Sequence, residues 1–422
     1  MSSEKSGAAG FAGSAATMFL ALRAGDAVNV AAGLWFVPKY VSPGEIGAVL
    51  PVASFATFLS LPVFAFAMAV MKEASWLAAA GRRAEVKSLL CGVFAAAAAL
   101  SAAVAAVAAI LAPAFLSAMR VDDLSAGFLA GAAAFLGCLA PVYTDALQSL
   151  KRFRALAAAE VCGAAVRFLV MAVAMPFRAL AGFFAGQAAL PVYRIAASVF
   201  ALRKDLAAPG AEGYWSRETR ARLAKGFLAV LAYQAAPMAA ALAEQSILRT
   251  SLSAADSAGY YMASRFADFL QYLTFPLLLA MFPYTASAAG RDEPVRPYVL
   301  KCSAVALAAG GLMAAAYSLC GAELMALAPN GAAYAEYARY MPWLAASGAL
   351  TACQVFHTNA EVSAGRAGFL KWLVPLHAAY PLALWAAVEA GAVASLSGLV
   401  ACFCAASAAR FAFAAAGTAR AR

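Results

Sequence analysis

The sequence predicts an all-α integral membrane protein with twelve transmembrane helices in two six-helix bundles related by pseudo-twofold symmetry. Of its 422 residues, 65% are hydrophobic and only 12% are charged, whereas a soluble globular protein is about half apolar and a quarter charged. Apolar runs long enough to cross a bilayer recur along the whole chain. The longest polar stretch, residues 203–225, lies at its middle. This composition excludes an ordinary soluble enzyme, a disordered protein and a DNA-binding domain.

Twelve apolar runs have the length of a membrane helix, about 20 residues. The first run begins after Lys5 and is interrupted by Arg23 and Asp26, and no small-residue cleavage site follows it. We therefore interpret it as a retained helix and not as a signal peptide. In order along the chain, the runs are 14–37, 45–70, 88–112, 125–148, 155–177, 180–202, 226–248, 257–286, 298–320, 338–359, 369–388 and 391–415.

Lysine and arginine are distributed unevenly between alternate loops. With the N-terminus in the cytoplasm, 21 of the 31 basic residues fall in cytoplasmic stretches, five in outer stretches and five inside spans. Basic residues of membrane proteins remain on the cytoplasmic side. The count predicts that both termini are cytoplasmic. It also explains the formal charge of +10 without nucleic acid as a partner.

The polar stretch at the middle divides the chain into two equal sets of predicted helices. We expect an N-terminal lobe at 1–202, a cytoplasmic linker at 203–225 and a C-terminal lobe at 226–422. Two local matches indicate an internal duplication, because Gly259 follows Gly47, and Arg366 follows Arg154, by the same 212 positions. Repeats with an even number of helices insert in the same orientation, so their pseudo-axis would run along the membrane normal, with a cavity between the lobes.

Five arginines lie inside predicted spans, where an ionised side chain costs about 2.5–3.5 kcal/mol and persists mainly beside a cavity, in a pair or near the surface. Arg23 and Asp26 share one helical face, as do Arg265 and Asp268. Each couple forms either an internal ion pair or part of the polar wall of a transport cavity. Arg167 lies deep in its span, and we expect it to face the cavity. The candidate substrate-binding residues are Arg23, Asn29, Arg167, Arg194 and Arg265.

Acidic residues in or near the spans are candidates for coupling transport to an ion. They are Asp26, Asp145, Glu244 and Asp268. Simpler interpretations stay open for some charges: Glu244 can pair with Arg249 at the outer interface, and Arg194 and Arg410 can extend to the membrane surface.

Catalytic and cofactor-binding patterns are missing from the sequence. It has no GxxxxGK[ST] phosphate-binding loop, no GxSxG and no HExxH. Two histidines and scattered cysteines do not suggest a metal site. We therefore expect a protein that is not an enzyme and holds no cofactor, with H⁺ or Na⁺ as a candidate coupling ion.

Several segments resemble bacterial polysaccharide flippases, the polysaccharide/O-antigen flippase family of the multidrug/oligosaccharidyl-lipid/polysaccharide (MOP) exporter superfamily. Residues 243–290 resemble the family's seventh and eighth helices, with its G-x-Y step at Gly259, Tyr260 and Tyr261 and its proline at Pro283. Further similar segments are 40–50, 146–161 and 330–347. The first-half counterpart of the G-x-Y step, at Gly47, lacks tyrosine, and the two extra helices of peptidoglycan-precursor flippases are missing.

The resemblance implies that the protein moves an undecaprenyl-diphosphate-linked oligosaccharide to the outer leaflet of the bacterial inner membrane by alternating access. Its expected partners are that lipid-linked oligosaccharide, membrane lipids and other membrane proteins of glycan assembly. Arginines are suited to diphosphate oxygens. One alternative is an H⁺- or Na⁺-coupled antiporter of drugs or metabolites from the same superfamily. A membrane-embedded glycan polymerase or ligase is a weaker alternative, since no long outer loop is present to hold its catalytic groups.

Overall fold

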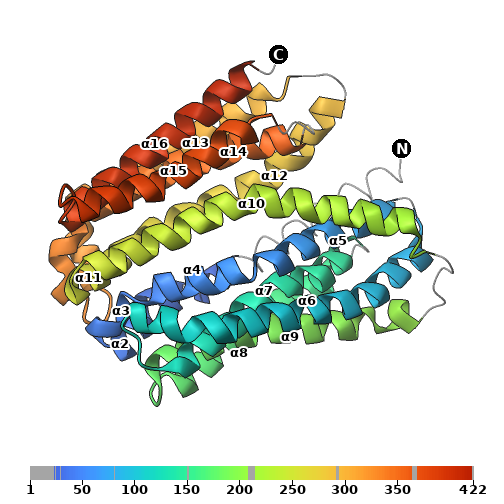
Figure 1. The fold of residues 1–422 in the computed structure, drawn as a ribbon, viewed down its shortest axis with the longest axis horizontal. Helices are drawn as coiled ribbons and strands as arrows, with labels where there is room; N and C mark the ends of the chain where they lie inside the picture. Colours follow the sequence, from blue (N-terminus) through green and yellow to red (C-terminus); the bar gives the residue numbers. More distant parts are fainter. Residues whose placement is uncertain are drawn as a thin grey trace. The chain divides into compact units, whose positions relative to one another are not determined.

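A computed structural model describes residues 23, 25–28, 30–79, 81–149, 152–207, 214–290, 294–363 and 368–420. Helices make up most of this part of the chain, and it contains no β-strand. The chain divides into two compact units (Figure 1). Unit 1 comprises 1–41 and 52–238, and unit 2 comprises 42–51 and 239–422. The chain is thus an all-α membrane protein of two helical bundles.

Unit 1 is a bundle in which α9 packs along both α7 and α8. The helices are η1 (Ala32–Phe36), α2 (Val37–Tyr40), α4 (Val49–Leu59, mostly in this unit), α5 (Leu61–Ala79), α6 (Arg83–Ala118), α7 (Leu124–Ser149), α8 (Phe153–Ala174), α9 (Ala179–Ala207) and the first part of α10 (Arg217–Ser251).

Unit 2 is built around α14, which packs against α12, α13 and α16. Besides the last part of α10, its helices are α3 (Pro43–Ile46), α11 (Ala254–Ala267), α12 (Phe269–Gly290), α13 (Arg296–Ala326), η2 (Gly331–Tyr340), α14 (Met341–Ser363), α15 (Leu370–Glu389) and α16 (Leu396–Arg420).

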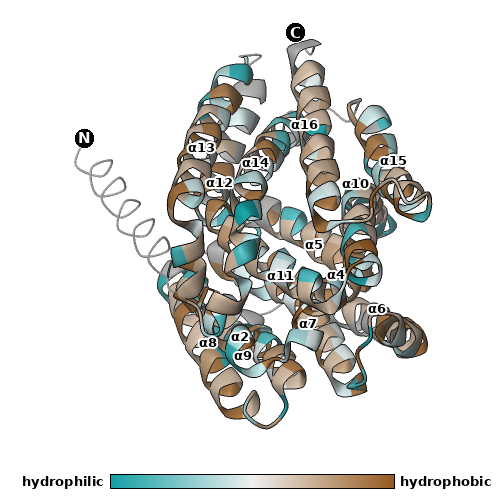
Figure 2. Cartoon of the chain, turned by 90° about the vertical axis from the view of Figure 1, so that its left-hand side faces the viewer, coloured by the Kyte–Doolittle hydropathy of each residue, from teal (hydrophilic) through white to brown (hydrophobic). Residues whose placement is uncertain are grey.

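Many helices are long and apolar enough to cross a membrane. Among the described residues, six helices meet this test singly, and α4 with α5 forms a bent seventh candidate. Figure 2 shows hydrophobic residues along helices such as α13 and α16, and large apolar side chains such as Val173 and Leu312 are 68% and 74% exposed. On helices of this length and hydropathy, such surface indicates contact with lipid. The protein is therefore a multi-pass membrane protein, while the number twelve stays a prediction.

Two predicted spans are interrupted. The run predicted at 45–70 bends by 56° between α4 and α5, at Ser60, whose hydroxyl donates to the Ala56 carbonyl at 2.9 Å. Pro62 follows and cannot donate a backbone hydrogen bond, which favours a break here. The run predicted at 257–286 is divided at Asp268, the C-terminal cap of α11.

The adjacent predicted runs at 369–388 and 391–415 are two separate helices, α15 and α16. Gly391 ends the first with φ of +70°, a conformation that glycine adopts without a steric penalty. Its amide donates to the Val388 carbonyl at 2.9 Å, which is the usual way a glycine closes a helix.

The segment predicted as a linker is largely helical. Residues 203–207 complete α9, and residues 217–225 begin α10. Ser216 caps α10, since its hydroxyl accepts from the Thr219 amide at 3.2 Å. The polar composition of this stretch therefore marks the ends of two helices as well as the connection between them.

A short segment of the first half of the chain packs within unit 2, where α3 contacts α11. The two helices begin alike: Ser42 donates to Glu45 at 2.8 Å, and Ser253 donates to Asp256 at 2.8 Å. These caps are 211 residues apart, one fewer than the offset of the glycines. Between the helices, a methyl group on Gly47 would collide with Ser257. A glycine here therefore allows the close approach.

Replacing Gly259 with alanine should destabilise the protein by about 1–3 kcal/mol, as overpacking does. The added methyl group would collide with the Tyr337 ring, whose hydroxyl donates to Asp256 at 3.2 Å. Thermal unfolding in detergent measures the effect. The control is Gly311→Ala, because nothing lies within 4 Å of the added methyl group and alanine favours a helix. Equal melting temperatures of the two variants would contradict the prediction.

Candidate functional site

Two polar contacts connect α8 and α9 inside unit 1. Arg167 Nη1 donates to the amide oxygen of Gln187 at 3.5 Å, and Arg194 forms an ion pair with Glu160. On each helix the two polar residues are seven positions apart, which places them on one face about 10 Å from each other. Arg167 is buried, with 3% of its surface exposed, and Glu160 with 8%. These contacts form a polar seam, here defined as Glu160, Arg167, Gln187 and Arg194.

The polar seam contains two of the predicted substrate-binding arginines and two residues that sequence reasoning missed. Arg194 is paired with Glu160, and 29% of its side chain is exposed. The signal for Glu160 was present, because it is an acidic residue two turns from Arg167 on the same helix.

The two predicted arginine–aspartate couples are ion pairs. Arg23 and Asp26 are 3.0 Å apart, and Arg265 and Asp268 are 2.9 Å apart. In both pairs about a quarter of each side chain is exposed. Each pair therefore satisfies its charges locally and leaves part of its polar surface accessible.

Glu244 lies in a second polar cluster, in unit 2. The carboxylate of Glu244 on α10 is close to Arg410 on α16 and Tyr380 on α15, and the Arg410 guanidinium lies 4.7 Å from the centre of the Tyr380 ring. Arg410 is only 8% exposed, so its side chain is enclosed within unit 2. We call Glu244, Tyr380 and Arg410 the acidic cluster.

In the part of the chain that the structure describes, the ion pair between Arg249 and Glu244 that one interpretation of the sequence proposed is not formed. Its Nη2 donates to the Gly44 carbonyl at 2.6 Å and fixes α3 to the end of α10. The approach of Arg410 could not be foreseen, because 166 residues separate it from Glu244.

Asn29 lies outside the described residues. Asp145 belongs to α7, and its side chain is outside what the structure describes. The described residues also contain no group of three His, Cys, Asp or Glu side chains that could hold a metal ion.

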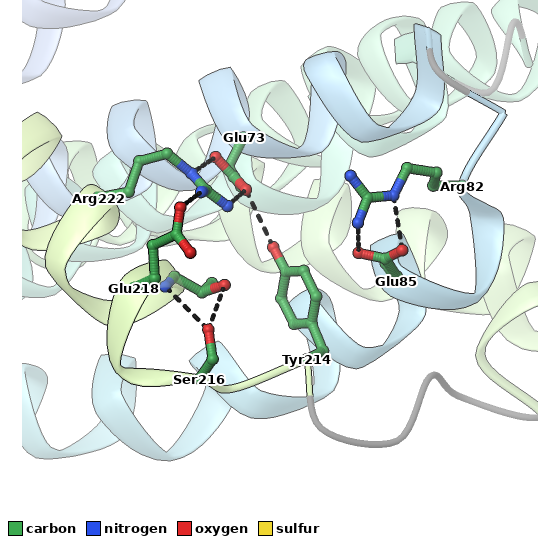
Figure 3. A network of polar contacts seen from close by, with 8 residues as sticks. Glu73, Arg82, Glu85, Tyr214, Ser216, Glu218 and Arg222 are labelled. Atoms are coloured by element: carbon green, nitrogen blue, oxygen red, sulfur yellow. Dashed lines mark hydrogen bonds and ion pairs between the residues drawn. The ribbon is translucent and has the colours of Figure 1, made fainter.

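A third polar network fastens the start of α10 to the end of α5 within unit 1 (Figure 3). Arg222 donates to both carboxylate oxygens of Glu73, at 3.0 and 2.6 Å, and the Tyr214 hydroxyl donates to Glu73 at 3.3 Å. Burial and the Glu73 carboxylate raise the pKa of Tyr214, so it remains a donor. We call Glu73, Tyr214 and Arg222 the latch.

The residue next to the latch anchors the same segment. The Trp215 indole N–H donates to the Ser88 carbonyl at 3.0 Å, and its ring lies where a side chain on Gly92 would be. The segment before α10 is thus held to both α5 and α6.

Similarity to solved structures covers nearly the whole chain, although no family model matches the sequence and no curated protein is significantly similar to it. An inward-facing multidrug resistance MATE family transporter of the MOP superfamily matches with a TM-score of 0.72 and 13% identity, over 93% of this chain and 92% of that one. An outward-facing structure of such a transporter matches with a TM-score of 0.63 and 14% identity, over 96% and 94%.

A third similar structure is a MOP superfamily transporter from Pyrococcus furiosus, described as having a binding pocket of reversed polarity that suggests a different function. It matches with a TM-score of 0.65 and 14% identity, over 96% of this chain and 93% of that one. At these identities the likeness establishes the fold alone. The fold is that of the MATE transporters of the MOP superfamily.

Proposed function

We propose that the protein is an alternating-access transporter that flips an undecaprenyl-diphosphate-linked oligosaccharide to the outer leaflet of a bacterial inner membrane. The observation that carries the proposal is the polar seam. It places the guanidinium groups of Arg167 on α8 and Arg194 on α9 between two packed helices, in contacts about two helical turns, or 10 Å, apart along the helix axes. Keeping arginines there is costly, and planar guanidinium groups match the oxygens of a diphosphate.

The fold supports the transport part of the proposal. Similar structures have been solved in inward-facing and outward-facing conformations, which is what alternating access requires. One of the similar transporters has a pocket of reversed polarity, so the fold is compatible with cargo of either charge. In this proposal both termini are cytoplasmic, no bond of the cargo is made or broken, and the other proteins of glycan assembly supply and remove it.

Deleting the gene in its natural host tests the proposal. Loss of the flippase should cause lipid-linked oligosaccharide to accumulate on the cytoplasmic leaflet, where added impermeant glycosidases cannot reach it. Expression of the wild-type chain should restore access. An unchanged amount and unchanged leaflet distribution of lipid-linked oligosaccharide would reject the flippase function.

The acidic cluster favours a second candidate, an H⁺- or Na⁺-coupled antiporter of drugs or metabolites. Glu244 is 6% exposed and belongs to α10, one of the candidate membrane spans, and a buried carboxylate can couple transport to a cation. The similar multidrug transporters support this candidate. The ion pairs with Arg23 and Arg265 weaken it, because they neutralise Asp26 and Asp268.

Replacing Glu244 with glutamine distinguishes the two candidates. If the arginines handle the cargo, the variant should retain most of its glycan export, because the amide keeps the shape and hydrogen-bonding capacity of the carboxyl group. Export and drug resistance are measured at several external Na⁺ concentrations and pH values and normalised to protein in the membrane. Two results together would favour the antiporter: the wild type exports no glycan, and the variant loses the cation-dependent drug resistance of the wild type.

A further inference from the structure

A groove of about 650 Å3 lies on unit 2, between the last turns of α13, η2 and the first turns of α14. Three charged side chains line it: Glu323 from α13, and Glu336 and Arg339 from η2. Its apolar lining includes Leu319 and Trp343, which are 85% and 62% exposed. None of these residues belongs to the polar seam, the acidic cluster or the latch.

The groove is a consequence of the backbone. Cys320 has φ of −134° and ψ of 23°, so it interrupts α13 and the helix continues beyond a kink. Small residues form the floor: a methyl group on Gly321 would lie 3.5 Å from the Ala338 side chain. The wall beneath is fixed, because the Tyr317 hydroxyl donates to the Phe266 carbonyl at 2.8 Å.

The three charges of the groove are exposed and available to a ligand. The Arg339 guanidinium lies 4.9 Å from the centre of the Tyr340 ring. Within the described part of the chain, no ion pair involves Glu323, Glu336 or Arg339. A ligand that carries both an ammonium and a phosphate would therefore find a partner for each charge.

An apolar stripe extends from the groove along α13. Val305, Leu312 and Leu319 are 51%, 74% and 85% exposed. They are seven residues apart, which is close to two helical turns, so they share one face over about 21 Å. In a membrane helix such a face lies against lipid tails, and its length exceeds the roughly 15 Å thickness of one hydrocarbon leaflet.

We propose that the groove binds the headgroup of an aminophospholipid of the phosphatidylethanolamine type, with an acyl chain along the apolar stripe. The ammonium donates to Glu323 and Glu336, and Arg339 donates to the phosphate. Trp343 lies beside the headgroup, as tryptophan does at membrane interfaces. A choline headgroup has no N–H to donate, and an anionic headgroup meets two carboxylates and only one guanidinium. The proposal does not depend on which cargo is transported.

Native mass spectrometry of the full chain tests the proposal with phosphatidylethanolamine, phosphatidylcholine and phosphatidylglycerol of identical acyl chains. The wild type should retain the ethanolamine lipid in preference to the other two. In the Glu323→Gln, Glu336→Gln double variant, the preference over choline lipid should fall at least about tenfold, because losing even one of the two charge-assisted hydrogen bonds implies that factor. Glu389→Gln is the matched control, since it removes an exposed carboxylate at the end of α15, outside the groove.

A second variant obstructs the groove without changing its charge. Ala322 is an exposed residue of α13 that lines the groove, and in Ala322→Trp the indole side chain would fill the groove. This variant should reduce retention of the ethanolamine lipid to the level of the double variant. Equal retention of ethanolamine and choline lipids by the wild type would overturn the proposal. So would preferred retention of the glycerol lipid, or an unchanged ethanolamine preference in both variants.

Discussion

Replacing Arg167 with alanine should lower glycan export at least tenfold while the protein still reaches the membrane. The residue lies in the polar seam, where its guanidinium is buried and donates to Gln187. Removing a buried charge lowers the cost of inserting α8 by about 2.5–3.5 kcal/mol, so assembly should not suffer. The planar guanidinium group that binds phosphate oxygens is lost, so glycan export should decrease. The measurement is surface glycan per unit of membrane-inserted protein.

Lysine at the same position should restore part of the export, because it keeps the charge but donates from a single point. Arg203→Ala is the matched control: this arginine also lies on a seam helix, α9, but it is exposed. Full export by Arg167→Ala, or an equal loss in the Arg203 variant, would remove the polar seam from cargo handling.

Replacing Glu73 with alanine should destabilise unit 1 by about 2 kcal/mol. Glu73 is 6% exposed and accepts hydrogen bonds from Arg222 and Tyr214. Hydrogen bonds to a charged group contribute about 1.5–3 kcal/mol each. The Arg222 side chain is 44% exposed and can turn to water, which reduces the loss. The melting temperature in detergent measures it.

The neighbouring Arg82–Glu85 pair is a matched control visible in the same view (Figure 3). It has a similar distance, 2.6 Å, but its side chains are 44% and 21% exposed and three residues apart on one segment. Such local pairs contribute about 0.5 kcal/mol or less. The melting temperature of Glu85→Ala should therefore be close to that of the wild type. If it decreased as much as that of Glu73→Ala, contacts between residues distant in sequence would not explain the stabilising effect of the latch.

Helix positions were predictable because the bilayer requires apolar runs of a narrow length. The predicted run 155–177 corresponds to α8, and 298–320 lies inside α13. The bend between α4 and α5 had a sequence signal in Pro62, whereas the break at Asp268 had none, because hydropathy averages out such local geometry. The 3-10 helix η2 was also missed, although its tyrosines recur every three residues.

Pairs within one helix were predictable, and contacts between helices were not. Spacing alone suggested the ion pairs of Arg23 with Asp26 and of Arg265 with Asp268. The partners of Arg194 and Glu244 lie 34 and 166 residues away along the chain, and no periodicity links such positions. Only packing of the helices identifies them.

Each half of the sequence contributes a segment to the other half's unit. Residues 42–51 come from the first half and belong to unit 2, whereas 214–238 follow the central connection and belong to unit 1. This is a reciprocal exchange, similar to domain swapping within one chain. We therefore expect that neither half folds alone, because fragments separated at 208–213 would each lack a segment that completes its unit, and that the two fragments supply both segments when they are synthesised together.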